Sequence, residues 1–79
     1  MNSTGSNNTA NGYRALYNNA NGFNNTADGY QSLYSNTTGS GNTANGYNTL
    51  YSSISGTGNV AFGSGAGYNL TTGSNNIAI

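Results

Sequence analysis

Apolar residues recur along this chain in short runs that are separated by polar stretches of constant length. The run Asn59-Val60-Ala61-Phe62-Gly63 has earlier relatives that begin at Asn8, Asn25 and Asn42, and a partial copy that begins at Asn76. These first asparagines stand at positions 8, 25, 42, 59 and 76, so every step is 17 residues. A fixed period of this size marks a repeat architecture. We therefore predict a flexible lead over residues 1–4 and one repeat domain over residues 5–79, whose coils start at residues 5, 22, 39, 56 and 73, the last of them truncated.

Each repeat predicts two short strands that are joined by bends. Glycine occupies the first and eighth positions, as at Gly5 and Gly12, where it suits a positive φ or a close approach of backbones. The run between them has alanine at its centre, and the run after the second glycine, such as Tyr13–Tyr17, is rich in tyrosine, which favours strands. Glycine this dense leaves no apolar stripe of helical period. The sequence thus predicts an all-β solenoid of stacked 17-residue two-strand coils.

Small residues at the sixth and eleventh repeat positions are predicted to face each other inside each flattened coil. Alternation along a strand would not place Ala15 and Leu16 on the same side, so we expect one of these two columns at an interface or exposed. The predicted coil interior consists of Ala10, Ala15, Ala27, Ser32, Ala44, Thr49, Ala61, Ala66 and Ala78.

The two residues that flank each central alanine are predicted to point outward. These columns are polar in the first three coils and apolar in the last two. An apolar column on a small domain is typical of a partner surface, and so slender a core favours oligomerisation. We interpret the columns as a subunit interface that is polar at one end and dry at the other: Thr9, Asn11, Thr26, Asp28, Thr43, Asn45, Val60, Phe62, Ile77 and Ile79.

Composition removes several classes of function. The chain holds one basic and one acidic residue, so no cluster of positive charge is present to bind nucleic acid or an anionic membrane. Histidine, cysteine and lysine are absent, which leaves acid–base, nucleophilic and metal chemistry without their usual groups. We therefore predict no enzyme, no cofactor and no metal site. No apolar run approaches the roughly 20 residues of a membrane span, so we predict no membrane insertion by this segment.

Tyrosines form two columns, at the ninth and thirteenth repeat positions. They are interpreted either as structural ladders, stacked coil on coil or packed between protomers, or as a face that binds a glycan or receptor. The fourth copy departs from the pattern, because Ser64-Gly65-Ala66-Gly67-Tyr68 replaces the Tyr-x-x-Leu-Tyr run, which predicts a changed outer face or coil shape there. The candidate ligand-facing residues are Tyr17, Asn18, Asn19, Tyr34, Asn36 and Tyr51.

The pattern Asn-Val-Ala-Phe-Gly-x-x-Ala, at residues 59–66, resembles the repeat of trimeric autotransporter adhesin heads, and Asn76-Ile77-Ala78-Ile79 matches the same pattern. The more polar form, Asn-Thr-Ala-Asn-Gly-Tyr-x-x-Leu-Tyr, resembles longer repeats of bacterial surface fibres and phage tail fibres. This resemblance implies a left-handed parallel β-roll that forms a homotrimer, with the flanking columns at the trimer axis. The family's period is shorter, so the extra residues are expected to enlarge one loop per coil.

The expected function is that of a non-enzymatic structural or adhesive fibre segment. It would be extracellular, on a bacterial cell surface as an outer-membrane fibre or on a virion as a tail fibre. Its partners would be two further copies of the chain and a host-cell, prey-cell or extracellular glycan or protein receptor. Two alternatives stay open: an ice-binding β-solenoid, because rows such as Thr26 and Asp28 are flat and polar, and an amyloid-type extracellular matrix protein, because Asn and Tyr ladders suit cross-β growth.

Overall fold

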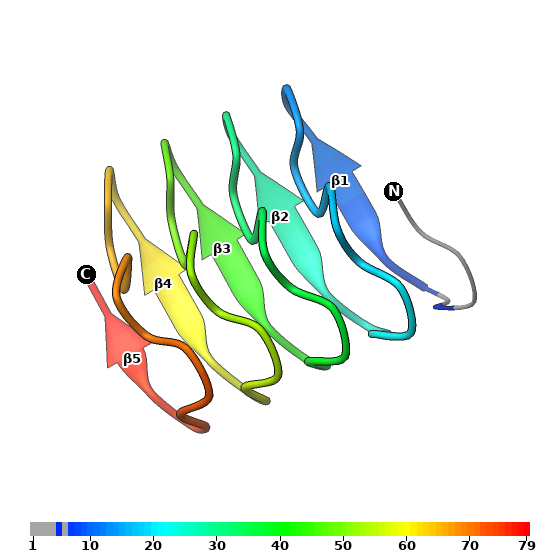
Figure 1. Ribbon diagram of the computed structural model, residues 1–79. Coiled ribbons are helices and arrows are strands. Elements are labelled where there is room, and N and C mark those ends of the chain that lie inside the picture. The colour runs from blue at the N-terminus through cyan, green and yellow to red at the C-terminus, as the bar shows by residue number, and fades with distance from the viewer. Residues whose placement is uncertain (1–4, 6) are drawn as a thin grey trace.

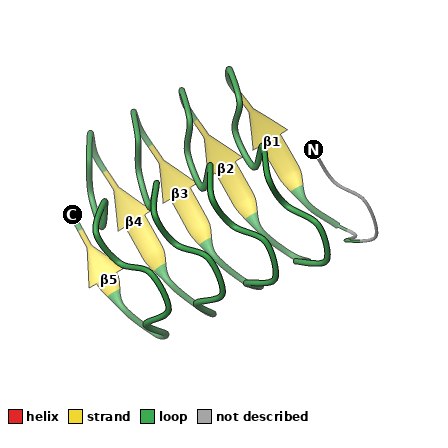
Figure 2. Ribbon diagram, viewed as in Figure 1, coloured by secondary structure: helices red, strands yellow, loops and turns green. Residues whose placement is uncertain are grey.

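A computed structural model describes residue 5 and residues 7–79, so the lead predicted over residues 1–4 lies outside the described residues. This part of the chain contains no helix and forms five short strands that build one parallel sheet in the order β1-β2-β3-β4-β5 (Figures 1 and 2). After each strand the chain leaves the sheet, closes a loop and returns one coil further along (Figure 1). The predicted all-β class and the stacked coils are confirmed. The strands are β1 (Thr9–Asn11), β2 (Thr26–Asp28), β3 (Thr43–Asn45), β4 (Val60–Phe62) and β5 (Ile77–Ala78).

The strands pair without any slip in register. Ala27 pairs with Ala44, and Ala44 with Ala61, so the central alanines form one continuous column across the sheet. The first residue of each of β1 to β4 donates its N–H to the next coil, as Thr26 does to the carbonyl of Asn42 at 2.8 Å. Residues one period apart in the sequence therefore lie on top of one another in space.

The second half of each coil is a series of turns, and the predicted second strand is wrong. Leu16 and Leu33 have φ values of 52° and 51°, and Arg14 and Gln31 have 59° and 55°. Such values belong to the left-handed region and exclude an extended strand. The turns still bond from coil to coil, because Leu33 N–H donates to the carbonyl of Thr49 at 2.9 Å. Each coil thus has one strand and, opposite it, one turn segment.

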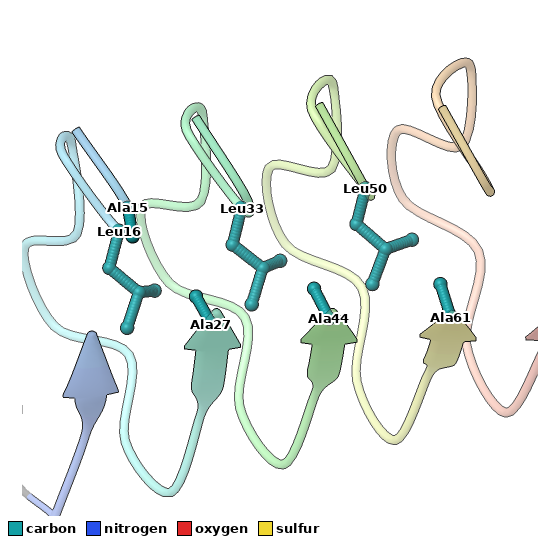
Figure 3. Close-up of a cluster of buried hydrophobic side chains, with 7 residues drawn as sticks. All are labelled: Ala15, Leu16, Ala27, Leu33, Ala44, Leu50 and Ala61. Carbon is teal, nitrogen blue, oxygen red and sulfur yellow. The ribbon is translucent and has the colours of Figure 1, made fainter. Parts of the chain in front are cut away.

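The core is a column of leucines that faces a column of alanines. Leu16, Leu33 and Leu50 point from the turn segments toward the sheet, where Ala27, Ala44 and Ala61 point back at them (Figure 3). The turn geometry also turns Ala15 inward beside Leu16, and both residues are buried. The argument from strand alternation, which kept Ala15 and Leu16 on opposite sides, therefore does not apply to this segment.

The residues of the predicted coil interior differ in burial. Ala27, Ala44, Ala61, Ser32 and Thr49 are completely buried and Ala15 nearly so, whereas Ala66 and Ala78 are half-buried and Ala10, in the first coil, is exposed. The two buried hydroxyls are paired across coils. Ser32 Oγ donates to the carbonyl of Gly46 at 2.6 Å, and Thr49 Oγ1 donates to that of Gly63 at 2.8 Å.

The fourth coil keeps the backbone path of the others despite its different sequence. Gly65 and Gly67, with φ of 72° and 65°, occupy the places where Gln31 and Leu33 have positive φ. The change predicted there affects the side chains and leaves the backbone in place. The core loses the leucine that would stand at Gly67, where an added Cβ would lie 2.8 Å from Leu50 Cδ2 and 3.4 Å from Leu70 Cδ1. Leu70, three positions later in the repeat, packs against the core in its place.

Two glycine columns form the bends, for two different reasons. Gly29 has φ of 124°, and a Cβ built on it would lie 2.6 Å from the carbonyl oxygen of Gly46. Gly39 lacks a positive φ, but its Cβ would lie 2.4 Å from both Asn36 Oδ1 and the carbonyl oxygen of Gly56. A side chain at either position would push neighbouring coils apart. Both reasons given for the repeated glycines are confirmed.

The asparagine that precedes each strand by one residue belongs to a buried ladder. Asn42 is completely buried, and its Nδ2 donates to the carbonyl of Gly56 at 2.8 Å and to Asn25 Oδ1 at 3.1 Å. Its own Oδ1 accepts the backbone N–H of Asn59 at 2.9 Å. The amide of Asn42 therefore links its coil to both neighbours. This explains why asparagine recurs in every copy at the position that revealed the period.

Candidate functional site

The outward face of the sheet presents the two columns that were predicted to form an interface. None of their ten residues is buried; Thr43 and Val60 are half-buried, and the others are exposed. Phe62, Ile77 and Ile79 are 46%, 76% and 97% exposed. The in-register pairing of Thr43 with Val60, and of Val60 with Ile77, makes one column that changes from hydroxyl to aliphatic along the sheet.

The turn segments carry two ladders of stacked tyrosines. Each ring in the ladder of Tyr13, Tyr30 and Tyr47 lies 5.3–5.4 Å from the next, with interplanar angles of 9–18°. In the second ladder the distances are 5.1–5.4 Å and the angles 4–9°; its members are Tyr17, Tyr34, Tyr51 and Tyr68. Stacking uses the faces of the rings, so the ladders mainly present ring edges and hydroxyls to solvent.

Arg14 connects the two ladders in the first coil. Its guanidinium carbon lies 5.0 Å from the ring centre of Tyr13 and 5.3 Å from that of Tyr17, within cation–π distance of both. The neighbouring Tyr13, chiefly through its Coulombic interaction, raises the pKa of the fully exposed Arg14 guanidinium. The cation is therefore held against the aromatic surface.

The candidate ligand-facing residues fall into two groups. Tyr17 is exposed, and Asn18, Tyr34 and Tyr51 are half-buried, so these four have atoms at the surface. Asn19 and Asn36 are completely buried and cannot face a ligand, which corrects the expectation for these two residues. They were grouped with loop residues because they lie in polar stretches whose composition is typical of turns.

Asn19 and Asn36 form a second buried amide ladder. Asn36 Nδ2 donates to Asn19 Oδ1 at 2.8 Å and to the carbonyl of Gly39 at 3.1 Å. The next residue of this column is Ser53, whose shorter side chain does not continue the ladder. Asn36 Oδ1 and Ser53 Oγ are both buried without a hydrogen-bond partner among the described residues. The sequence signal for this ladder is the recurrence of asparagine at residues 19 and 36 followed by its loss at residue 53.

Apart from these two faces, the described residues form no further candidate site for a ligand or a metal ion. Residue 5 and residues 7–79 form no pocket and no group of three or more His, Cys, Asp or Glu side chains that could hold a metal ion. A search of the same residues for a helix of the length and hydropathy needed to cross a bilayer finds none. Comparison with protein-family models, with curated proteins and with solved structures finds no match to this chain. The functional argument therefore depends on the two exposed faces, the sheet and the tyrosine ladders.

Proposed function

We propose that this chain is a non-enzymatic segment of a fibre, in which three copies associate through the outward face of the sheet as a left-handed β-roll. Such a fibre would project from a bacterial cell surface or a virion and mediate attachment or target recognition. The observation that carries the proposal is the outward column pair, which stacks in register and exposes Phe62, Ile77 and Ile79 at one end. Large exposed apolar side chains that gather on one face are typical of an interface.

Burial of this end would supply a useful part of the association energy. Phe62 is 46% exposed, which is roughly 90 Å² for a phenylalanine, or about 2 kcal/mol per chain if this surface is covered completely. Three symmetry-related copies would contribute about 6 kcal/mol from this residue alone. The polar end of the columns adds little by the same measure, because Thr26 and Asp28 carry hydroxyl and carboxylate groups that must be desolvated.

The test is the native mass of the chain in solution, measured by multi-angle light scattering together with far-UV circular dichroism. We expect a β-rich particle of three times the chain mass of 8.0 kDa. The variant Phe62→Asn, which restores the residue found at the same position in the first and third coils, should keep the fold and weaken the trimer. The matched control is Phe23→Ser, because Phe23 is 51% exposed but lies in a loop outside the columns.

A folded, β-rich wild-type monomer would refute the proposed association. Equal effects of Phe62→Asn and Phe23→Ser on the mass would place the interface elsewhere.

Ice binding is the second candidate, and one observation favours it. The hydroxyls of Thr9, Thr26 and Thr43 stand on successive strands in register, so they form a regular row at the spacing of a sheet, about 4.8 Å. The row ends at Val60. Thermal hysteresis well above that of an ordinary protein at equal concentration would support this function, and its absence would exclude it.

A further inference from the structure

The ladder of Tyr13, Tyr30 and Tyr47 ends at the fourth coil, where Ser64 takes the place of a tyrosine. Tyr47 stacks on Tyr30 through one ring face, and no other ring of the described residues stacks against it. Tyr47 is 55% exposed, whereas Tyr30, which stacks on both sides, is 41% exposed. Tyr47 therefore has one aromatic face that the ladder does not use.

The fourth coil leaves this face uncovered. Ser64 is exposed, and a Cβ added to Gly63 or Gly65 would meet no heavy atom within 4 Å. The backbone beneath is nevertheless fixed, because Gly65 N–H donates to the carbonyl of Tyr47 at 2.7 Å and Ala66 N–H donates to that of Gly63 at 3.1 Å. The end of the ladder is thus a step in the surface, at which one face of the Tyr47 ring is exposed above a backbone fixed by hydrogen bonds.

The groups around the step are neutral and polar. Asn48 follows Tyr47 and is half-buried; its Oδ1 is buried and has no hydrogen-bond partner in the described part of the chain. Ser64, which carries a hydroxyl, is exposed one period after Tyr47. The two charged residues, Arg14 and Asp28, belong to the first and second coils. A ligand that fits has an apolar face, a rim of hydroxyl groups and no charge.

We propose that the free face of Tyr47, with the exposed Ser64 one period further along the stack, binds one pyranose ring of a neutral glycan. A pyranose presents a face of C–H bonds that packs on an aromatic ring, while its hydroxyls can form hydrogen bonds with the hydroxyl of the exposed Ser64. A planar aromatic ligand would gain most between two rings, and this step supplies only one. The site lies on the turn segments, across the coil from the sheet, so it does not depend on the proposed trimer.

The test is a titration of the intact chain, carrying ¹³C-labelled tyrosine rings, with methyl β-D-glucopyranoside and methyl β-D-galactopyranoside. We expect a saturable shift of the Tyr47 ring signals with at least one of the two sugars, and a dissociation constant in the millimolar range. Ser64→Tyr would extend the ladder over the free face, and we expect it to weaken binding by about tenfold or more. Tyr13→Ser shortens the ladder at its distant end and should leave the affinity unchanged.

Three results would overturn the site. They are no saturable shift of the Tyr47 ring with either sugar, equal shifts throughout both ladders, and unchanged affinity in Ser64→Tyr. If Ser64→Tyr alters the circular dichroism spectrum, Tyr47→Ser replaces it as the variant that must lose binding. Light scattering on the same samples reports the oligomeric state separately, so loss of sugar binding and loss of the trimer are told apart.

Discussion

The substitution Ser53→Asn should extend the second amide ladder by one coil. Asn36 donates to Asn19 Oδ1 at 2.8 Å and to the carbonyl of Gly39 at 3.1 Å. One period later the same places are taken by Ser53, Asn36 and Gly56. An amide at residue 53 with the same geometry would donate to Asn36 Oδ1, which is buried without a partner in the described structure, and to the carbonyl of Gly56.

The expected gain follows from the hydrogen bonds made and the groups left unpaired. Two new bonds contribute about 0.5–1.5 kcal/mol each. The unpaired Asn36 oxygen becomes paired, but the new amide oxygen lies beside Leu70, the next residue of the column, and remains unpaired. Ordering the longer side chain costs about 1 kcal/mol. We therefore expect the free energy of unfolding to rise by about 1 kcal/mol.

Urea unfolding followed by far-UV circular dichroism measures this change, at one fixed protein concentration so that any assembly contributes equally. With a slope of about 1 kcal/mol per molar urea, the midpoint should rise by about 1 M. The control is Ser52→Asn, which adds the same group one residue earlier, at a half-buried position that Asn18 occupies in the first coil. A lower midpoint for Ser53→Asn, or an equal rise for both variants, would refute the ladder argument.

Three further predictions use the same unfolding measurement. Gly29→Ala should lower the free energy of unfolding by more than about 3 kcal/mol, because residue 29 has a positive φ and its new Cβ would lie 2.6 Å from a carbonyl oxygen. Gly63→Ala should cost only about 1–2 kcal/mol, because residue 63 has a φ of 113° but open space around it. Equal costs would contradict the close approach of the coils. Asn42→Ala should lower the stability by about 3 kcal/mol or more, since all three hydrogen bonds of the buried amide are lost; a cost below about 1 kcal/mol would show that the ladder is solvated. Asp28→Asn should strengthen the proposed trimer at low ionic strength by removing repulsion between three like charges, and light scattering on diluted samples should then show a lower dissociation constant; no change would place Asp28 away from the axis.

The period alone predicts the register of the sheet, because residues 17 apart must occupy equivalent places once the coils stack. The central alanines and both glycine columns followed from that equivalence, and Ala44 and Gly29 lie where it places them. The outward columns followed from strand alternation, which holds for each central alanine and the residues directly before and after it.

The turn segment could not be predicted in the same way, because its backbone opposes local preference. The run is rich in tyrosine, which favours strands, and leucine rarely adopts the positive φ that Leu16, Leu33 and Leu50 have, so a strand was predicted there. Burial of the leucine against the alanine column outweighs this strain in the first three coils. The fourth coil does hold the clue, since Gly65 and Gly67 mark the two positions of positive φ that the other coils fill with larger residues.

The hydrogen-bond ladders have a mechanical consequence for a fibre. β1 and β5 lie at opposite ends of the stack, and the bonds between coils run along the stack from each coil to its neighbour (Figure 1). Tension applied between the two ends therefore acts along these bonds. It is expected to break the bonds of one coil before those of the next. Each released coil of 17 residues adds about 55–60 Å of extended chain. A segment built in this way lengthens in discrete steps under load while its remaining coils stay folded.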